Sequence, residues 1–407
     1  MKTRYGDSFW LTQFHPKRRP AYPRHRGHIN AEVAIVGGGM IGCSTAYGLA
    51  VAGASVVLIE AGSIGQASTA ASTGLLMQEP AKDYKPLEER YGKRVAQRIW
   101  QMTRRAMLDF AATLRRLRVR CQLDGRDGLY IATKPDHVLR LRRELSSRRA
   151  AGLEASTWLT ADRVRQQINF SELGAIRTRG NGQLDPYRAC LGLAAAAAAR
   201  GALIRERSAA TRIRFDRTGV EIQTKGGTLR ARRVVIATGT ATPLFKSLNR
   251  HLQELQTYAV MTPPLNAKIR AELGRCDAMV RDTEEPYHYL RWNRDGRILF
   301  GGADQPRTSG RQRGKILVQR AGQLMYELST WYPVISGIQP EYAWDQLITT
   351  TADGLPYIGP HRNYPHHLFA LGCGGNSLAM SFLASRMLVR YHTGAAAKGD
   401  ELLGFGR

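Results

Sequence analysis

The sequence feature that most constrains the fold is a glycine-rich turn near residue 40 that joins a strand-like run to a helical one. Gly37, Gly39 and Gly42 form a G-x-G-x-x-G pattern directly after the apolar run 33–36 and at the start of a helical pattern over 40–52. The first glycine permits a tight turn, the second lets a pyrophosphate approach the backbone, and the third lets the helix pack on the strand. We therefore expect a β-α-β unit that binds a dinucleotide.

An acid ends the second strand-like run of this unit. Glu60 follows the run 55–59 and lies 18 residues beyond Gly42, where a carboxylate can accept hydrogen bonds from both ribose hydroxyls. A carboxylate at that point repels a 2′-phosphate, which argues against NADP. The amides and the positive end of the helix face the phosphates. We assign Met40, Ile41 and Ala61 to the same site.

Two later segments favour FAD over NAD. The segment RRVVIATGT (232–240) is a strand that closes on Ala237, Thr238 and Gly239. The segment LFALGCGGNSLAMS (368–381) again has a strand, a glycine-rich turn and the start of a helix. Two helix N-termini aimed at one extended ligand suit FAD, whose isoalloxazine lies far from its adenine. The alternative is two ordinary strand-to-helix turns.

Composition and cysteine usage exclude several classes of protein. The chain has 407 residues with 43% apolar content, and no apolar run of about 18 residues that could span a bilayer. The basic segment 1–30 lacks the apolar core of a secretory signal and is expected to pack against the first domain or trail from it. The five scattered cysteines form no C-x-x-C pair, so neither a disulfide framework nor a zinc site is expected, and no metal is assigned. We expect a cytoplasmic protein, with the inner face of a membrane as an alternative location.

The net charge of +27, from 60 basic and 33 acidic residues, allows two interpretations. One is a surface for nucleic acid or anionic lipid. The other, which we favour, is the solvated faces of arginine-rich helices, because the basic stretches 93–120 and 140–149 carry apolar residues at helical spacing. No recognition motif for DNA or RNA accompanies the charge, so a nucleic-acid partner is not expected.

The order of the elements predicts an α/β, two-domain (α+β) protein. We expect strands at 33–36, 55–59, 129–132, 219–223, 233–237, 298–301 and 368–370, and helices near 40–52, 93–118, 136–150, 186–200, 315–330 and 376–392. Strands and helices alternate early and strands dominate the middle, which indicates a parallel domain interrupted by an antiparallel-rich part. We expect a basic arm over 1–30, a discontinuous FAD-binding domain over 31–110, 175–245 and 340–395, and a substrate or cap domain over 111–174 and 246–339.

Together these segments resemble the D-amino-acid oxidase superfamily of FAD-dependent amine and amino-acid oxidoreductases. The resemblance covers most of the chain from residue 32 to about residue 390. It is carried by VAIVGGGMIG, QASTAASTGLL, GQLDPYR, VVIATG, YHYLRWNRDGRILFGG, TADGLPYIG and GCGGN. It implies a Rossmann-like FAD domain built from discontinuous segments, with a second domain whose antiparallel sheet covers the flavin.

The resemblance also implies where the cofactor is held. The segment 68–74 is expected near the flavin and its phosphates, and Ala210 at the backbone position that contacts adenine. The further residues that we expect in the cofactor site are Ser68, Thr69, Ser72, Thr73, Gly74, Gly359, Gly372, Gly374, Gly375, Asn376 and Ser377.

The segment Tyr287-His288-Tyr289-Leu290-Arg291 resembles the strand that presents an arginine to the substrate carboxylate in that superfamily. Residues i and i+4 of a strand share one face, and an arginine binds a carboxylate through two parallel hydrogen bonds. We therefore expect Arg291, with Tyr287 and Tyr289, to form the catalytic site. The alternative is that Arg291 is one more surface arginine.

The resemblance implies hydride transfer from the carbon of a C–N bond to FAD, giving an imine that water hydrolyses. The substrate is then a D-amino acid, glycine, an N-methyl amino acid or a related amine. Some relatives attach flavin to a cysteine before the T-x-D turn, whereas this sequence has Gln346 there, so we expect FAD to be bound non-covalently. The electron acceptor is oxygen, or alternatively a quinone or carrier protein at a membrane surface. A tRNA-modifying flavoprotein is a further alternative.

Overall fold

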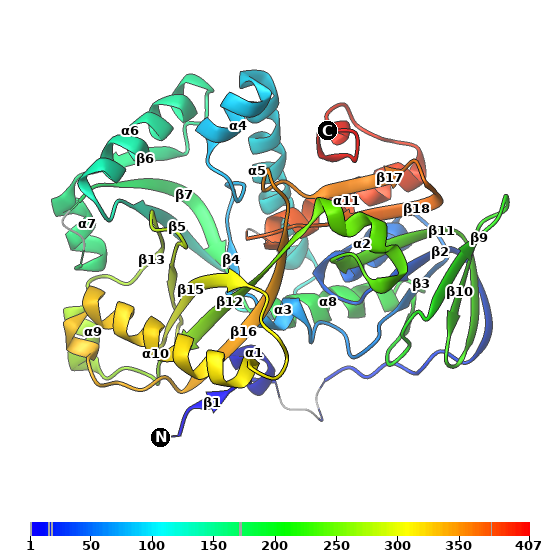
Figure 1. Ribbon diagram of the computed structural model, residues 1–407, viewed down its shortest axis with the longest axis horizontal. Helices are drawn as coiled ribbons and strands as arrows, with labels where there is room; N and C mark the ends of the chain where they lie inside the picture. Colours follow the sequence, from blue (N-terminus) through cyan, green and yellow to red (C-terminus); the bar gives the residue numbers. More distant parts are fainter. Residues whose placement is uncertain (1, 15–16, 18, 171–172, 376) are drawn as a thin grey trace.

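Two β-sheets of different construction form the framework of the protein. Figure 1 shows them in the computed structural model, with the larger sheet on the left and the smaller one on the right. The structure describes residues 2–14, 17, 19–170, 173–375 and 377–407.

The smaller sheet carries the glycine turn. In the described part of the chain it has eight strands in the order β17-β18-β11-β2-β3-β8, with β10 paired to β11 and β9 paired to β10. The pairs from β18 through β8 are parallel, and the others are antiparallel. The bounds are β2 (Gly27–Val36), β3 (Val56–Ile59), β8 (Leu203–Arg205), β9 (Arg212–Phe215), β10 (Val220–Thr224), β11 (Gly227–Gly239), β17 (Tyr357–His361) and β18 (Tyr364–Leu371).

Both faces of this sheet are covered, which explains why its strands read as continuous apolar runs. In β2, Val33 and Ile35 point into the main core, whereas Ala34 and Val36 point into a second core that includes Phe245. The helices α2 (Met40–Val51), α8 (Pro186–Ala198) and α11 (Ser377–Thr393) lie against the first face, and α5 (Lys93–Arg116) packs on α11.

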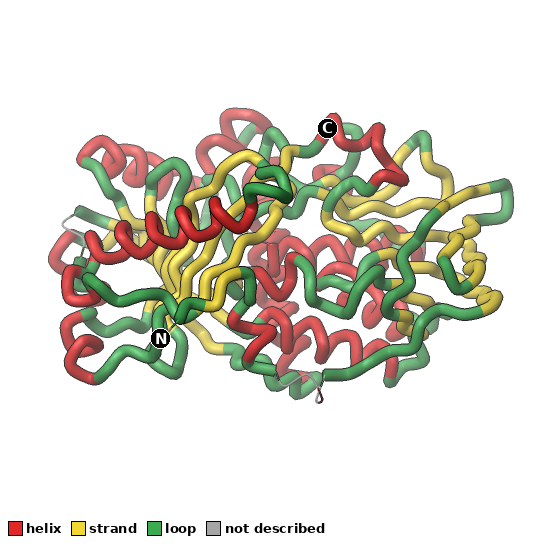
Figure 2. The backbone as a smooth tube through the Cα atoms, turned by 60° about the horizontal axis from the view of Figure 1, so that its bottom comes forward, coloured by secondary structure: helices red, strands yellow, loops and turns green. Residues whose placement is uncertain are grey.

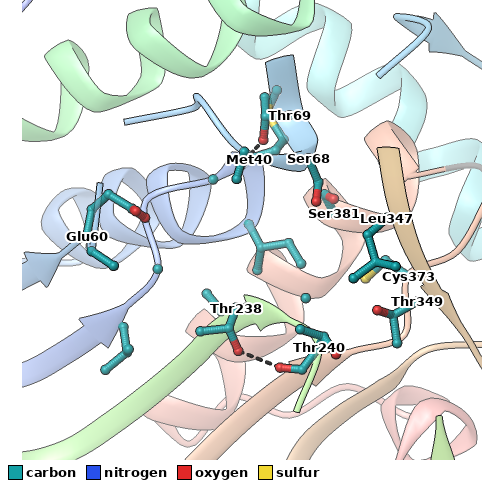
Figure 3. Close-up of a pocket in the computed structure, with 18 of the residues that line it drawn as sticks. Met40, Glu60, Ser68, Thr69, Thr238, Thr240, Leu347, Thr349, Cys373 and Ser381 are labelled. Carbon is teal, nitrogen blue, oxygen red and sulfur yellow. Dashed lines mark hydrogen bonds between the residues drawn. The ribbon is translucent and has the colours of Figure 1, made fainter. Parts of the chain in front are cut away.

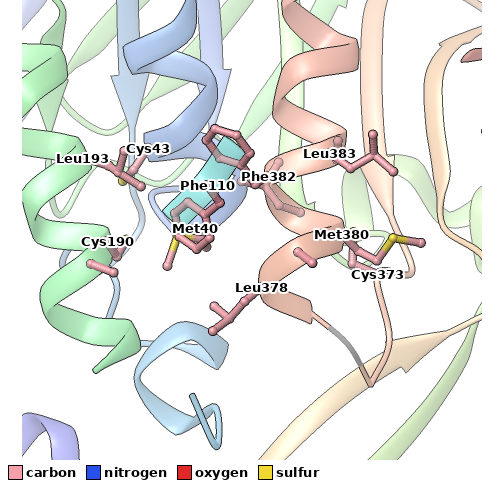
Figure 4. Close-up of a cluster of buried hydrophobic side chains, with 14 of the residues drawn as sticks. Met40, Cys43, Phe110, Cys190, Leu193, Cys373, Leu378, Met380, Phe382 and Leu383 are labelled. Atoms are coloured by element: carbon pink, nitrogen blue, oxygen red, sulfur yellow. The ribbon is translucent and has the colours of Figure 1, made fainter. Parts of the chain in front are cut away.

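Figure 4 shows how these helices meet beneath the glycine turn. Met40 of α2 lies among Phe110, Phe382 and Leu378 from α5 and α11, and Cys43 lies near Cys190 of α8. The Phe110 and Phe382 rings stack with centroids 5.0 Å apart. The start of α2 is therefore anchored by three other helices, and its backbone amides are held in place.

The larger sheet is mostly antiparallel. Its path is β1-β16-β12-β15-β14-β13-β5-β7-β4, and β6 also pairs with β7. The bounds are β1 (Arg4–Tyr5), β4 (Leu75–Leu76), β5 (Asp124–Ile131), β6 (Ser156–Leu159), β7 (Ala175–Gln183), β12 (Gln253–Met261), β13 (Ala278–Asp282), β14 (Tyr289–Trp292), β15 (Ile298–Pro306) and β16 (Tyr342–Thr350).

One face of the larger sheet packs on helices and the other faces the smaller sheet. The helix α10 (Arg313–Trp331) contacts β12, β15 and β16, and Figure 2 shows it lying across these strands. The remaining helices are α1 (Phe9–Thr12), α3 (Ser68–Ala71), α4 (Tyr84–Tyr91), α6 (Pro135–Ala150), α7 (Ala161–Ile168) and α9 (Ala267–Glu272), with short 3-10 segments at Pro243–His251, Pro333–Ile335 and Asp400–Leu403.

The structure confirms the predicted α/β architecture and each of the predicted strands and helices. Three strands, β4, β7 and β16, belong to the larger sheet, whereas the sequence predicts that 31–110, 175–245 and 340–395 lie in the FAD-binding domain. Strand pairing is non-local, so the sequence does not reveal this membership. The division into domains stays a proposal.

The N-terminal arm packs onto the body of the protein. Its β1 adds a parallel strand to β16, and α1 buries Phe9 and Trp10 in the main core. Among the described residues, no helix is both long enough and apolar enough to cross a membrane.

His288 fastens α10 to the outer face of the larger sheet. Its ring stacks on Phe300 at 5.2 Å, its Nδ1 lies 2.7 Å from Asp282 Oδ2, and its Nε2 lies 3.1 Å from Glu327 Oε2. Burial by itself lowers its pKa, but the two carboxylates outweigh burial and raise the pKa of His288 to about 9. The imidazolium is therefore a structural group, as its position on the face opposite Tyr289 indicates.

This arrangement predicts a loss of stability at alkaline pH. The pKa of an unfolded histidine is about 6.5, so the stabilisation is complete below that value and is lost as the pH rises through about 9. We expect the free energy of unfolding, measured by urea denaturation, to fall from pH 6.5 to 9. In His288→Gln, whose amide does not titrate, the fall should be smaller. Equal falls in both proteins would refute the role of His288.

Candidate functional site

The turn between β2 and α2 can be built only with glycines at two of its positions. Gly37 has φ +110°, and a Cβ there would lie 2.7 Å from the carbonyl oxygen of Ala237. A Cβ on Gly42 would lie 1.8 Å from the carbonyl oxygen of Gly37. The backbones of the turn, of the start of α2 and of the end of β11 therefore lie in direct contact. The helix α2 begins at Met40.

Glu60 is fixed at the mouth of this turn. Its Oε2 accepts a hydrogen bond from the amide of Gly38 at 2.7 Å, and its Oε1 accepts one from the amide of Gly62 at 2.7 Å. Each carboxylate oxygen keeps a second lone pair that can accept from a ribose hydroxyl. The geometry thus matches the role that the sequence predicted for Glu60, which stays a proposal.

A cavity of about 330 Å³ lies along the turn and extends toward the larger sheet. Figure 3 shows Glu60 at one end, Thr238 and Thr240 below, and Leu347, Thr349 and Cys373 at the other end. The predicted cofactor residues that line it are Gly37, Gly39, Met40, Ile41, Glu60, Ala61, Ser68, Thr69, Ser72, Ala210, Ala237, Thr238, Gly239 and Gly374. Segments far apart in the sequence therefore converge on one elongated space.

A second, smaller cavity adjoins the first against the larger sheet. Both linings share Ser72, Gln346, Ile348 and Gly374. Thr73 and Gly375, which we predicted for the cofactor, line the second cavity, and so does Tyr289.

Four predicted glycines line neither cavity, so their assignment to the cofactor site stays a prediction. Gly42 packs α2 on β2, and Gly359 faces the ring of Tyr391, 2.9 Å from the position of a Cβ. Gly372 (φ +74°) faces Thr351, and Gly74 (φ +74°) faces the carbonyl oxygen of Leu184. Their small size allows a backbone or a side chain to pack closely against them. Asn376 lies outside the described residues, and Ser377 is the first residue of α11.

The sequence prediction missed the contribution of β16. Gln346, Leu347, Ile348 and Thr349 line the cofactor cavity, together with Ser208, Thr240, Cys373 and Ser381. The sequence did offer a signal, because residues 346–349 lie just before the TADGLPYIG motif. Of these residues the sequence prediction used only Gln346, which stands where some relatives have a flavin-bound cysteine.

The loop between α3 and β4 is held by side chains from three distant elements. Five successive carbonyls accept hydrogen bonds from outside the loop. Those of residues 70, 71 and 72 accept from the Ser8 hydroxyl, from Trp344 Nε1 at 2.9 Å and from Trp10 Nε1 at 2.8 Å. Those of residues 73 and 74 accept from Arg291 Nη1 at 2.9 and 3.2 Å. We call residues 70–74 the clamped loop.

The contacts of Arg291 favour a structural role over the substrate-binding role that the sequence predicted, which stays a prediction. Its side chain is buried and lines neither cavity, and Nη1 also donates to the carbonyl of Leu184 at 2.9 Å. It lies 5.0 Å from the Trp10 ring centroid, and burial lowers the pKa of its guanidinium. The strand periodicity put it on the correct face, but its Nη1 is bound to three backbone carbonyls, while its Nε is buried without a partner.

Tyr287 and Tyr289 do approach the candidate cofactor site. Their rings meet edge to face with centroids 4.8 Å apart. A Cβ on Gly375 would lie 2.6 Å from the Tyr287 hydroxyl and 3.7 Å from that of Tyr289, so both phenols point at the C-terminal glycine turn. Burial raises the pKa of both phenols, which are therefore neutral near pH 7.

The register of the larger sheet explains the space beside these tyrosines. Side by side on its inner face lie Trp344, Ala259, Gly301, Tyr289 and Arg281, one from each successive strand. Two small residues between Trp344 and Tyr289 leave a shallow floor, and Thr73 of the clamped loop faces it. A flat ring system fits such a floor.

The residues present fit FAD, with the glycine turn and Glu60 at one end and the flat floor at the other. In the described chain all five cysteines are free, and burial raises the pKa of the Cys373 thiol, which lines the cavity, to about 12. A neutral thiol is a poor nucleophile, so the site favours non-covalent binding. No group of three or more metal-ligating side chains was found among the described residues.

Trp10→Phe tests the clamped loop. The change removes only the indole N–H and leaves the Ser72 carbonyl without its donor. An unsatisfied buried acceptor costs about 1–3 kcal/mol, or roughly 5–150-fold in an equilibrium constant. We expect FAD to bind more weakly within that range in a fluorescence titration. The control Trp331→Phe, on the outer side of the larger sheet, should bind FAD as the wild type does, and equal affinities in both variants would contradict the role of Trp10.

Arg291→Met separates a structural from a substrate-binding arginine. The carbonyls of Thr73 and Leu184 lose their donor and that of Gly74 keeps only the Leu184 amide, so we expect the melting temperature to fall by roughly 2 °C or more, with loss of bound FAD. The exposed neighbour Arg294→Met provides the matched control and should melt as the wild type does. An unchanged melting temperature with a higher substrate requirement would restore the role predicted from the sequence.

Comparison with known proteins agrees with this geometry. Residues 32–391 match the family described as FAD dependent oxidoreductase. The chain is 24% identical over 376 residues to gamma-glutamylputrescine oxidoreductase of Escherichia coli, covering 91% of this chain and 86% of the relative. It is 25% identical over 389 residues to glycine oxidase of Bacillus licheniformis, covering 92% and 96%.

A solved structure shows the same fold. Glycine oxidase from Geobacillus kaustophilus superposes with a TM-score of 0.77 at 24% identity, covering 93% of this chain and 99% of that one. The protein is therefore an enzyme that belongs to the FAD-dependent oxidoreductase family to which D-amino-acid oxidase gives its name.

Proposed function

We propose that this enzyme oxidises the C–N bond of an amine or amino acid. The observation that carries the proposal is the second cavity, which adjoins the cofactor cavity and shares four lining residues with it. A small molecule placed there lies between the flat floor of the larger sheet and the clamped loop. The relatives named for amines and amino acids, gamma-glutamylputrescine oxidoreductase and glycine oxidase, support this choice of substrate.

FAD, bound non-covalently, supplies the hydride acceptor. Its adenosine end fits the glycine turn and Glu60, and its ring fits the region where the two cavities meet, near Gly374 and Ser72. The predicted residues that line these cavities form the proposed cofactor site.

The protein's own residues orient the substrate and exclude water. Tyr289 and Trp344 form two walls of the second cavity, and Tyr287 stands behind Tyr289. A substrate nitrogen must be neutral to release hydride from its carbon, and a dry, aromatic-walled cavity favours the neutral form. The imine product then leaves for hydrolysis by water.

The proposed reaction has two forms, which differ in the electron acceptor that reoxidises the flavin. With oxygen the enzyme is an oxidase, and with a quinone or carrier protein it is a dehydrogenase. The net charge of +27 favours docking on an anionic membrane or an acidic carrier in the second form.

Anaerobic mixing of the FAD-loaded enzyme with amines and amino acids tests the proposal. We expect at least one compound to abolish the flavin absorbance near 450 nm, whereas free FAD mixed with the same compound should keep its colour. A protein that binds FAD and is bleached by no amine or amino acid would refute the proposed function. Admission of air, or of a soluble quinone, then shows which acceptor restores the colour.

A further inference from the structure

Asp304, on β15, has a carboxylate oxygen without a partner. Its Oδ1 is buried and makes no hydrogen bond, although the side chain interacts with the Thr257 hydroxyl. Two other acids of the same sheet are satisfied: Asp282 accepts from His288 and from two backbone amides, and Asp345 accepts from Arg313. A buried carboxylate oxygen without a donor is costly, so Asp304 is the acid that a ligand can complete.

Asp304 is a neighbour of the second cavity, although its side chain is not part of the lining. Thr257 and Tyr289, two residues that line the cavity, both interact with it. Among the described residues, none that lines this cavity carries a charge at neutral pH. Asp304 therefore determines the electrostatic potential at this end of the cavity, and its negative charge favours a cation.

A competing cation of the protein is Arg281, one strand beyond Tyr289 on the inner face. Its guanidinium lies 4.6 Å from the ring centroids of both Tyr130 and Tyr287, and it has an acid, Asp83, at 3.7 Å. Its Nε is also buried without a partner, so a substrate carboxylate that reached it is the competing possibility. Arg281 already has an acidic partner, whereas the cation that acts on Asp304, the His288 imidazolium, is bound through both ring nitrogens to Asp282 and Glu327. Because Oδ1 of Asp304 still has no donor, the observations favour a cationic ligand.

We propose that Asp304 binds the protonated nitrogen of the substrate, and that the substrate is an amine without a carboxylate on the reacting carbon. This inference rests on the proposed function and narrows its substrate class.

The same carboxylate can make the amine reactive. The ammonium N–H bond breaks, the proton moves to a carboxylate oxygen of Asp304, and a neutral amine and a neutral carboxylic acid result, with no other reactant needed. Burial raises the pKa of Asp304, against the opposing effects of Thr257 and His288, and so makes it a better proton acceptor than an exposed carboxylate.

A non-oxidisable amine tests the binding step without turnover. Tert-butylamine has no hydrogen on the carbon next to nitrogen, and its dissociation constant with the FAD-loaded enzyme can be measured by calorimetry. Loss of one charged hydrogen bond should weaken binding about tenfold or more in Asp304→Asn. The exposed control Asp216→Asn should bind as the wild type does, and Asp304→Glu should recover part of the affinity. FAD content and melting temperature show that each variant is folded.

Wild-type affinity in a folded Asp304→Asn protein would overturn the assignment of Asp304. The substrate class is tested by anaerobic bleaching with matched pairs, such as propylamine against both enantiomers of 2-aminobutyrate. We expect the amine to bleach the flavin at lower concentration than either amino acid. Bleaching by the amino acid alone would overturn the class and point to Arg281. If no compound bleaches the flavin, the proposed function fails, while the tert-butylamine measurement still decides whether Asp304 binds a cation.

Discussion

The cofactor cavity depends on the clamped loop, because that loop has almost no structure of its own. Residues 70–74 comprise the last two residues of α3 and the three residues before β4, and their carbonyls accept from Ser8, Trp10, Trp344 and Arg291. Each donor comes from a segment more than 60 residues away in the sequence. If one is removed, a buried acceptor is left at a cost of about 1–3 kcal/mol, which is a large share of the 5–15 kcal/mol that stabilises a typical protein. The N-terminal arm and the larger sheet are therefore part of the cofactor site, although neither need touch the cofactor.

This dependence explains which parts of the site could be predicted from the sequence. The glycine turn and Glu60 are local, because spacing along one β-α-β unit fixes their relation, and the structure brings them together around one cavity. The face of Arg291 was also predictable, since strand residues alternate and Leu290 packs in the outer core. Its partners were not, because the pairing of β4 with β7 brings the carbonyls of Gly74 and Leu184 to it.

The same distinction applies to the residues that were missed or misplaced. Gly359 lies in a motif typical of the family, yet its neighbour is Tyr391 on α11, a contact between elements that no spacing reveals. Gln346 and Ile348 face both cavities because β16 is paired with β12 in one particular register. The helices and strands could be predicted from the local periodicity of the sequence. The residues that contact one another could be identified only from the long-range pairing of the strands.

The charge distribution links the candidate substrate site to the whole molecule. A protein with a net charge of +27 repels cations at long range, which argues against a cationic substrate if only the total charge is considered. Surface charges are screened beyond about 8 Å at physiological ionic strength, whereas a buried carboxylate acts on its neighbour across a medium of low dielectric constant. The unpaired oxygen of Asp304 therefore outweighs the distant arginines for a ligand already inside the cavity. The positive surface then affects the rate at which a cation enters and the choice of an anionic electron acceptor, while Asp304 determines what the cavity retains.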